Sequence, residues 1–249
     1  MKAILTYHSI DSSRSPISVS PAEFRRHVTW LASGAVRVVP VAELVRLPAS
    51  ANAVALTFDD AFANFATDAA PLLAEHALPA TLFVVPDQVG GTNAWGGRAA
   101  GDLPTLPLLD WHALAKLAES GVEIGAHGRS HCSLAGLDAV RLEDEVAGSV
   151  AVLGQRTGVR PAGFAYPYGI ADAAAAASAR SACDWACTVE LRTVGDTDDA
   201  HLLPRLDMYY LRAPGRLESW GSGRFRRYLW LRSQGRQVRR RLSSVAGLQ

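Results

Sequence analysis

The sequence predicts a single α/β domain in which helices alternate with the strands of a mostly parallel sheet. Helix and strand signals follow one another from end to end, as in chains built from β/α units. At 249 residues, the chain has the length of one α/β barrel domain and can bury a sizeable core. Apolar residues make up 49% of it and charged residues 20%, which is typical of a soluble globular enzyme. No internal repeat or linker interrupts this pattern.

The expected strands are short apolar runs. Residues 3–7 form the first candidate, and residues 52–58 form the second because Ala53, Val54, Ala55 and Leu56 are continuously apolar. Such runs are typical of strands that are buried on both faces, as in a parallel sheet. The remaining strands are expected at 80–85, 122–126, 163–166 and 184–189.

Start and stop signals define the helices. Ser20 and Glu23, with a proline between them, form a capping box that begins a helix, and Gly34 follows its end. Asp110 and Asp138 are expected to cap two later helices, which are also followed by glycines. The expected helices are 21–32, 41–47, 64–76, 110–120, 138–157 and 171–182. A long loop is expected at 86–109, with Trp95 and Asp102, because this segment is rich in glycine and proline; loops of this length often bind substrate.

The cysteines and the first residues favour the cytoplasm. Cys183 and Cys187 lie four residues apart on one expected strand, too far apart to bridge, and Cys132 is expected to be a small packing residue. The first eight residues turn polar too soon for a signal peptide, and no run of 18 apolar residues is present.

Charge divides the chain into an acidic body, residues 1–211, and a basic extension, residues 212–249. The extension holds ten arginines and one acidic residue, and its segment 223–232 mixes arginines with aromatic residues and leucines. One interpretation is a helix that covers the barrel with its arginines in solvent. Another is an amphipathic segment on the inner face of an anionic membrane. Nucleic-acid binding is not expected, because the body is acidic and no recognition motif is evident.

Two adjacent carboxylates, Asp59 and Asp60, follow the apolar strand 52–58. Like charges side by side at the end of a buried strand cost stability, so such a pair indicates a metal or acid/base site. The structural alternative is that Asp60 caps the next helix.

Two histidines, His127 and His131, follow the strand at 122–126. Histidines four residues apart can share one face of a helical turn and converge on one ion. Since His127 and Asp60 both leave strand ends, the two elements can bring ligands to one rim of the barrel. Two histidines and one carboxylate, with positions left open, are typical of a catalytic zinc-like site. The alternative is a pair of solvated loop histidines.

A third segment, residues 164–169, runs from a strand into a turn that contains Tyr166, Pro167 and Tyr168. Proline fixes the local backbone, so the N–H of Tyr168 can serve as a preorganised donor to a developing oxyanion. The alternative is a tyrosine-rich turn that packs on the core.

Together these segments resemble the polysaccharide deacetylase family, carbohydrate esterase family 4 with its nodulation-type deacetylase domain. The sequence Thr-Phe-Asp-Asp matches the first family motif, and a His-x-x-x-His segment matches the second. The sequence Phe-Ala-Tyr-Pro-Tyr-Gly is similar to the third in one branch of the family. The motifs lie at 57–60, 127–131 and 164–169, with similar framing segments at 7–10, 79–84 and 123–127. The resemblance spans residues 3–210.

The resemblance implies a distorted (β/α)7 barrel and a role for each matching residue. Asp60, His127 and His131 would hold a divalent metal, usually zinc. Asp59 would be the general base for the attacking water, and the N–H of Tyr168 would bind the oxyanion. The substrate implied is an N-acetylated amino sugar of a polysaccharide, oligosaccharide or glycolipid.

Three departures from the family pattern bear on the mechanism. Gly128 replaces the usual Ser or Thr, which removes a hydroxyl that helps to fix the histidine loop. Ala165 stands where many members carry an arginine that pairs with the base, and Arg205 is the candidate substitute. No late Leu-x-His motif supplies a general acid, so His8, at the end of the first strand, is a candidate proton donor; its alternative is a structural histidine.

The predicted function is removal of an N-acetyl group from an amino sugar. Two alternatives remain open. One is a deformylase or other amide hydrolase that uses the same site. The other is a catalytically inactive glycan-binding member; Asp59 argues against this one, because a binding module has no use for a base.

Overall fold

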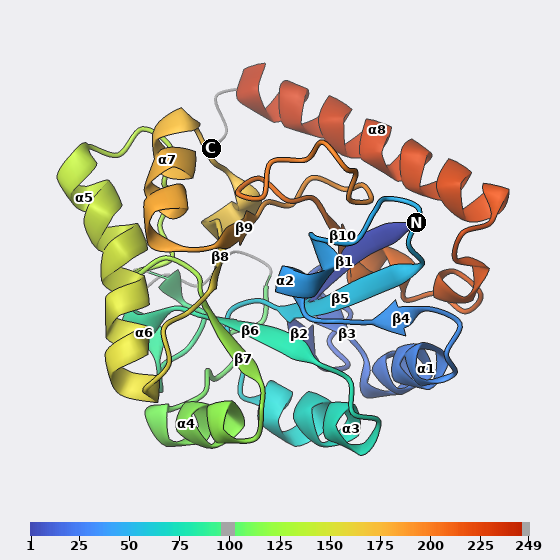
Figure 1. The fold of residues 1–249 in the computed structure, drawn as a ribbon, viewed down its shortest axis with the longest axis horizontal. Coiled ribbons are helices and arrows are strands. Elements are labelled where there is room, and N and C mark those ends of the chain that lie inside the picture. The colour runs from blue at the N-terminus through green and yellow to red at the C-terminus, as the bar shows by residue number, and fades with distance from the viewer. Residues whose placement is uncertain (96–102, 246–249) are drawn as a thin grey trace.

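The computed structural model describes residues 1–95 and 103–245, with side chains up to Arg236 in the last helix. Within these residues, a parallel sheet of seven strands curls into a nearly closed barrel, with a short eighth strand paired outside it (Figure 1). The (β/α)7 barrel prediction is confirmed. The barrel strands, in spatial order, are β10 (Arg205–Asp207), β1 (Lys2–Tyr7), β5 (Ala53–Phe58), β6 (Ala80–Val84), β7 (Glu123–Ala126), β8 (Gly163–Ala165) and β9 (Trp185–Cys187). The eighth, β4 (Arg37–Val38), pairs with β5.

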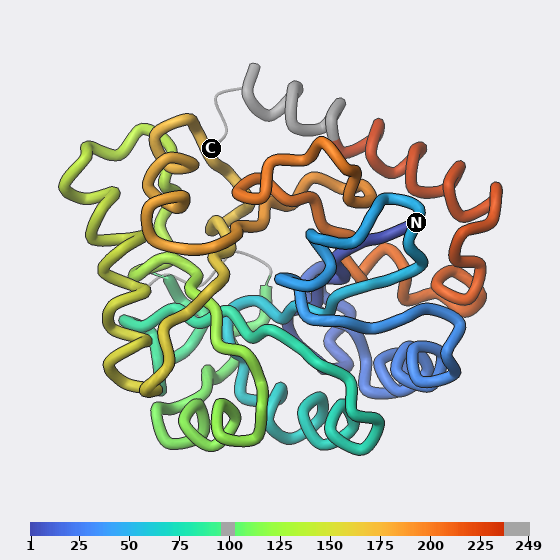
Figure 2. The backbone as a smooth tube through the Cα atoms, viewed as in Figure 1, coloured from blue at the N-terminus to red at the C-terminus, as the bar shows by residue number. Residues whose placement is uncertain are grey.

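The barrel is closed by segments that are far apart in the sequence. The first and last strands are neighbours, since Ile4 of β1 pairs with Arg205 of β10 (Figure 1). On the other side, Cys187 of β9 forms a parallel bridge with Leu203, just before β10. Figure 2 shows the chain passing around the barrel between these two ends.

Alternating residues divide the core into two parts. Along β1 and β5, one set of side chains packs outward against the helices, whereas Ile4 and Ala55 point into the barrel. Phe83 and Trp185 fill this interior. A Cβ at Gly125 would lie 2.5 Å from the Phe83 ring, and one at Gly163 would lie 2.2 Å from Trp185, so both glycines are required by close packing.

Helices surround the strands (Figure 1). The capping box at Ser20 is present, and Asp110, Asp138 and Asp172 each cap a helix through the side chain. The helices of the body are α1 (Pro21–Ala32), α2 (Val41–Leu44), α3 (Ala70–Glu75), α4 (Trp111–Glu119), α5 (Ala139–Glu143), α6 (Ser149–Thr157) and α7 (Ala173–Ala182). The predicted helices 64–76 and 138–157 each contain a π-helical turn, at Phe65–Ala69 and Asp144–Gly148.

Several elements differ from the prediction. Strand β10, β4 and the small β2–β3 sheet (Ser9–Ile10 with Ser18–Val19) were not expected, because two or three residues give no periodic signal. Strand β9 and α2 are shorter than predicted. In the expected loop 86–109, Pro86–Gln88 form a 3-10 turn, and Asp102 lies outside the described residues.

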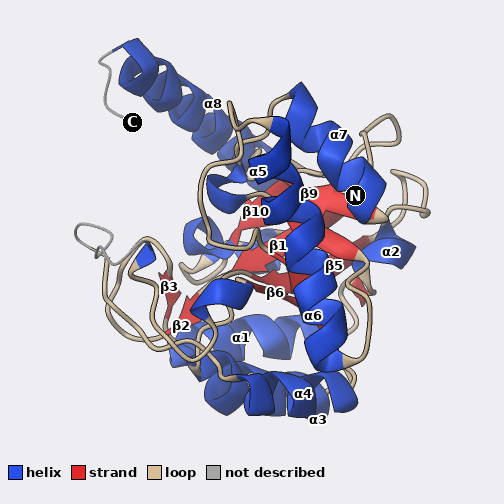
Figure 3. Cartoon of the chain, turned by 90° about the vertical axis from the view of Figure 1, so that its left-hand side faces the viewer, coloured by secondary structure: helices blue, strands red, loops and turns tan. Residues whose placement is uncertain are grey.

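The basic extension folds into a long helix, α8 (Gly223–Val245). Phe225 and Leu229 are buried and hold its first turns against the body. Figure 3 shows that the helix then extends past the barrel on the side where the strands end. The helices of the described residues include none that is both long and apolar enough to cross a membrane. The division of the chain at residue 211 stays a prediction.

Candidate active site

The two adjacent carboxylates lie at the carboxyl end of β5, and both are buried. Asp59 continues the strand direction into the barrel. Asp60 and Ala61 have left-handed backbones, with φ of 71° and 55°, and Asp60 does not cap the helix that follows. Residues without a glycine's freedom seldom adopt this conformation, and it clusters at functional sites. The turn directs the two side chains to different neighbours.

His127 lies at the end of β7, and the backbone of β8 fixes its ring. Its Nδ1 lies 2.7 Å from the carbonyl oxygen of Ala165. A carbonyl can only accept, so Nδ1 carries the proton and donates. The lone pair of Nε2 is then free and faces Asp60. Ala165, which replaces an expected arginine, therefore orients a ligand through its backbone.

His131 reaches the same point from a loop rather than from the expected helical turn. Residues 127–131 have no helical assignment, and Gly128 and His131 have φ of 70° and 65°. Burial is the main reason that the pKa of His131 lies well below its ordinary value, and the nearby His127 lowers it further. The imidazole is therefore neutral, which is the form that binds metals.

Glu145 holds the histidine loop and was not anticipated from the sequence. Its Oε2 accepts hydrogen bonds from the N–H groups of Arg129 (2.8 Å) and Ser130 (3.0 Å), and its Oε1 accepts one from the Ser130 hydroxyl (2.6 Å). A hydroxyl residue in place of Gly128 would be strained, because the backbone has a positive φ and a Cβ there would lie 3.1 Å from Pro167. Loop orientation therefore comes from a buried carboxylate on the π turn after α5.

Asp60, His127 and His131 form a group that fits a divalent metal. The Asp60 Oδ1 lies 3.3 Å from His131 Nε2 and 3.5 Å from His127 Nε2, and the ligand atoms lie within 4.8 Å of one another. This Oδ1 is buried and has no hydrogen-bond donor among the described residues. Burial raises the pKa of Asp60 because the carboxylate is desolvated. A cation between these three atoms would satisfy the unpaired oxygen, and two nitrogens with one oxygen suit zinc.

Arg205 of β10 pairs with Asp59 inside the barrel. Its Nη1 and Nη2 donate to Asp59 Oδ1 and Oδ2 at 2.6 and 2.8 Å, and both residues are at least 98% buried. The Arg205 Nε donates a hydrogen bond to the backbone carbonyl oxygen of Thr188 at 2.9 Å. Burial alone would raise the pKa of Asp59, but the charge of Arg205, with His127 and His8, outweighs it and holds this pKa well below its usual range. Asp59 is therefore fixed as a carboxylate.

His8 lies beside Asp59 at the end of β1. Its Nε2 is 3.8 Å from Asp59 Oδ2, and the ring is partly exposed to the cleft. Asp207 of β10 faces the same region: burial raises its pKa, and the charge of His8 lowers it. Asp207 was missed because β10 carries no sequence signal, although its pairing with Thr6 sets it near the end of β1.

The turn after β8 contributes its three predicted residues differently. Tyr166 is buried and donates its hydroxyl to the His201 carbonyl at 2.9 Å, so this side chain packs in the core. Pro167 packs beside Gly128 of the histidine loop. Tyr168 has a left-handed backbone (φ 58°), and its half-exposed ring lies edge-on to His131, with centroids 4.8 Å apart.

These groups open into one cleft of about 740 Å³. Its lining includes His8, Asp59, the three candidate metal ligands and Tyr168. Trp95, from the loop after β6, stacks on His131 with ring centroids 4.2 Å apart and also lines the cleft. Residues of η6 (Met208–Leu211) and α8 complete the lining, and these were not anticipated.

Known proteins share sequence features and the fold of this chain. The family model described as polysaccharide deacetylase matches residues 46–183, more than half of the chain. This segment contains Asp59, Asp60, both histidines and Tyr168, whereas His8 and Arg205 lie outside it. Among curated proteins, the chain is 27% identical over 151 residues to YxkH of Bacillus subtilis (strain 168), provisionally named a polysaccharide deacetylase. The match covers 59% of this chain and 49% of YxkH, so the chain spans about half the length of that relative.

Solved structures share the fold. The deacetylase PplD of Streptococcus pyogenes, in complex with acetate, superposes with a TM-score of 0.68 at 21% identity, over 82% of this chain and 91% of PplD. IcaB from Ammonifex degensii gives 0.69 at 24% identity, over 88% of this chain and 93% of IcaB. At these identities the likeness establishes the barrel architecture.

Proposed function

The chain belongs to the polysaccharide deacetylase family, and on this premise we propose that it is a metal-dependent hydrolase that removes an N-acetyl group from an amino sugar. The substrate would be part of a polysaccharide, an oligosaccharide or a lipid-linked glycan. The observation that carries this proposal is the buried Asp60–His127–His131 group beside the Asp59–Arg205 pair, in a single cleft.

Asp60, His127 and His131 would hold a divalent ion, for which zinc is expected from the donor set. When bound, the ion would polarise the acyl carbonyl and lower the pKa of a water ligand. The hydrogen bonds from His127 to Ala165 and from the histidine loop to Glu145 keep the ligands in one orientation.

Asp59 would accept a proton from the attacking water. Arg205 occupies one lone pair on each of its oxygens and keeps the carboxylate charged, while further lone pairs remain free toward the cleft. The new C–O bond forms at the acyl carbon, and the N–H of Tyr168 would donate to the resulting oxyanion. His8, on the cleft side of Asp59, would then protonate the sugar nitrogen as the C–N bond breaks. Acetate and a free amine leave.

Two other uses of the same cleft remain candidates. A deformylase or another amide hydrolase would need the same ligands and base and would differ only in the acyl group that it admits. A glycan-binding member without turnover would not need Asp59 held as a carboxylate by a buried arginine, so the Asp59–Arg205 pair favours an enzyme.

The experiment measures acetate and formate released by the purified protein, with and without added zinc. The substrates are N-acetylated chitooligosaccharides and a lipid-linked N-acetylglucosamine. Zinc-dependent acetate is expected; formate release from an N-formyl analogue would favour the deformylase. Asp59→Asn should retain zinc and lose about 10²- to 10⁴-fold in turnover, the range expected for a general base. The exposed Asp68→Asn is the matched control. Full turnover by Asp59→Asn would refute the assigned base.

The proposed location is the cytoplasm, with contact to the inner face of the membrane through α8. The three free cysteines, two of them buried, support a reducing compartment. The arginines of the extension, with Trp230 exposed beside them, support contact with anionic lipid.

A further inference from the structure

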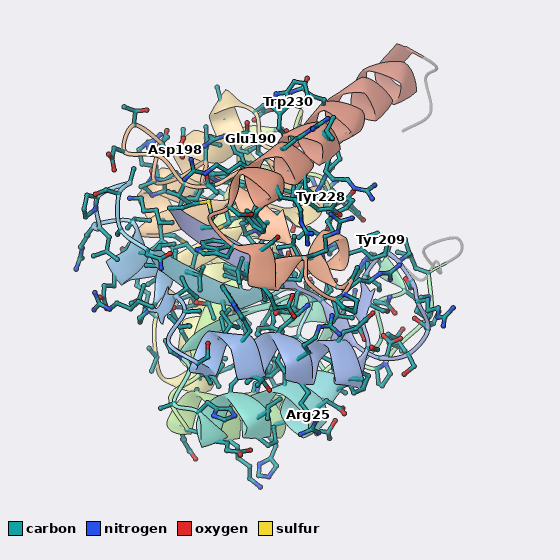
Figure 4. The ribbon with its side chains drawn as sticks, turned by 90° about the vertical axis from the view of Figure 1, so that its right-hand side faces the viewer. Arg25, Glu190, Asp198, Tyr209, Tyr228 and Trp230 are labelled. Atoms are coloured by element: carbon teal, nitrogen blue, oxygen red, sulfur yellow. The ribbon has the colours of Figure 1, made fainter. Side chains whose placement is uncertain are left out.

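Helix α8 forms part of the wall of the candidate active-site cleft. Its residues Leu231, Arg232, Gly235 and Arg236 line the same cleft as the candidate metal ligands. Figure 4 shows Tyr228 on the side of α8 that faces the barrel, and this is the side on which Arg232 follows one helical turn later. The basic extension therefore contributes to the site itself.

The two arginines that line the cleft are held by aromatic rings. The Arg232 guanidinium lies over Tyr228 and Tyr210, at 5.3 and 5.7 Å from the ring centroids, and that of Arg236 lies 5.6 Å from the Tyr210 centroid. The Arg232 Nε also donates to the Tyr228 hydroxyl at 3.2 Å, and this hydroxyl donates to the Tyr210 carbonyl at 2.6 Å. These contacts orient both guanidinium groups before any ligand binds.

Neither arginine has an anionic partner among the residues that the structure describes. Arg129, Arg180 and Arg192 form ion pairs with carboxylates, but Arg232 and Arg236 form none. Within the same residues, the Arg236 Nη1 is buried without any hydrogen-bond acceptor. A buried donor left unpaired costs about 1–3 kcal/mol. Asp207 lines the same cleft, and burial raises its pKa against the opposing charges of His8 and Arg236, but Asp207 and Arg236 form no ion pair. An anionic ligand in the cleft would supply an acceptor for this donor.

We infer that Arg232 and Arg236 form an anion subsite that holds a phosphate group of the substrate. This inference rests on the proposed function and specifies its substrate class: an amino sugar that carries a phosphate ester near the acylated unit. Two guanidinium forks one turn apart suit the several oxygens and double charge of a phosphate. Arg232 and Arg236 both belong to α8, so the phosphate would lie at the part of the cleft that α8 lines. A lipid-linked sugar phosphate and a nucleotide-linked sugar both offer this chemistry.

The test begins with binding, which does not require turnover. Calorimetry measures Kd for N-acetylglucosamine 1-phosphate and for neutral N-acetylglucosamine. Wild type should bind the phosphorylated sugar at least tenfold more tightly, and that Kd should rise between 50 and 500 mM NaCl because the contact is ionic. Arg236→Gln should weaken binding of the phosphorylated sugar by about tenfold or more. Arg227→Gln, an exposed arginine of α8 outside the cleft lining, should not.

Turnover then identifies the source of the phosphate. We compare kcat/KM for three substrates: a lipid-linked N-acetylglucosamine, a nucleotide-linked N-acetylglucosamine and methyl N-acetylglucosaminide, which has no phosphate. At least one of the two phosphate-containing substrates should have a higher kcat/KM than the methyl glycoside. The ratio of these two kcat/KM values should fall tenfold in Arg236→Gln. The better of the two substrates identifies the natural source.

The outcomes separate this inference from the proposed function. Equal Kd values for the charged and neutral sugars, no effect of salt on wild type, or equal losses in Arg227→Gln and Arg236→Gln would overturn the subsite. Phosphate-dependent binding without release of acetate from any substrate supports the subsite and refutes the deacetylase. Acetate release with no preference for phosphate-containing substrates would support the deacetylase and refute the subsite. If Arg236→Gln fails to fold, Arg232→Gln takes its place, and equal binding by this variant and wild type would overturn the subsite.

Discussion

The pair Asp59 and Arg205 replaces an interaction that the sequence motif lacks. Ala165 is too short to contact the carboxylate, and Arg205 reaches it from β10, which only β1 separates from β5, through both terminal guanidinium nitrogens. The arginine also lies over the Phe83 ring, 5.7 Å from its centroid. Because both charges are buried, either residue alone would leave an uncompensated ion in the barrel interior.

At this scale we predict that Arg205→Met lowers the free energy of unfolding by about 3–5 kcal/mol, the usual cost of breaking a buried ion pair. The double variant with Asp59→Asn should be more stable than Arg205→Met alone, because it removes the unpaired carboxylate. Urea denaturation followed by circular dichroism measures both. Arg37→Met, which breaks the exposed Arg37–Glu43 pair, is the control and should cost less than about 1 kcal/mol. Similar losses in the two arginine variants would contradict the prediction.

At the scale of elements, the loop after β7 depends on the π turn after α5. Glu145 of this turn accepts hydrogen bonds from two backbone N–H groups of the loop and from the Ser130 hydroxyl, through both of its oxygens, and the neighbouring Asp144 pairs with the Arg129 side chain. A π turn shifts the helical register by one residue, and such turns occur often at functional sites. The turn between α5 and α6 therefore helps to fix the loop that carries His131.

Accordingly, Glu145→Ala should weaken zinc affinity by about 10- to 100-fold, as removal of an outer partner of metal ligands usually does. Competition with a fluorescent zinc chelator gives the affinity without reference to activity. Glu143→Ala is the matched control, because Glu143 lies two residues earlier with its side chain in solvent. Unchanged zinc affinity in Glu145→Ala would show that the loop keeps its conformation by other means.

Helix α8 presents a second face away from the barrel. Trp230 is 61% exposed there, and Figure 4 shows it on the side of the helix opposite Tyr228. We predict that the protein co-sediments with vesicles of phosphatidylserine and phosphatidylcholine at low salt, and that Trp230→Ser reduces the bound fraction severalfold. Val140→Ser removes a more exposed apolar side chain on α5 and should have no effect. Absence of sedimentation, or equal effects of the two variants, would refute membrane contact through α8.

For the whole molecule, long apolar runs and helix caps were readable from the sequence, and short polar elements were not. Local sequence alone predicts the apolar runs of β5 and β6 and the N-terminal caps of α1 and α4. Strand β10 is only Arg-Leu-Asp, so its place beside β1 depends on tertiary pairing. The candidate metal ligands were readable because they follow strands directly. Glu145 and Asp207 were not, since their relevance comes from neighbours distant in sequence.

Stability should depend on pH through His27, which joins three parts of the molecule. Its Nε2 donates to the Leu211 carbonyl at 3.3 Å, and its Nδ1 accepts from the Tyr7 hydroxyl at 3.2 Å. Burial, followed by the charge of Arg26, lowers the pKa of His27 to about 4. The unfolded chain, with a histidine pKa of about 6.5, therefore takes up the proton first as pH falls. The contribution of His27 is complete above pH 6.5 and is lost between pH 6.5 and 4.

The expected size of this effect is about 2 kcal/mol between pH 7.5 and pH 5. The glutamine in His27→Gln does not titrate. The difference in unfolding free energy between wild type and this variant should therefore shrink by about 2 kcal/mol as the pH falls from 7.5 to 5. Denaturant titrations at several pH values measure it. His112→Gln, at an exposed histidine of α4, is the control. A difference that stays constant with pH would exclude His27 as the cause.

The pairing of β1 with β10 also determines when the candidate active site can form. Asp59 and Arg205 are 146 residues apart in the sequence, and Arg205 lies on β10, the last strand of the barrel to be synthesised. Until β10 has been synthesised, Asp59 lacks its arginine and β1 lacks one of its partner strands. Contacts of such long sequence separation form late and slowly. The Asp59–Arg205 pair is therefore expected to form only after nearly the whole barrel has been synthesised.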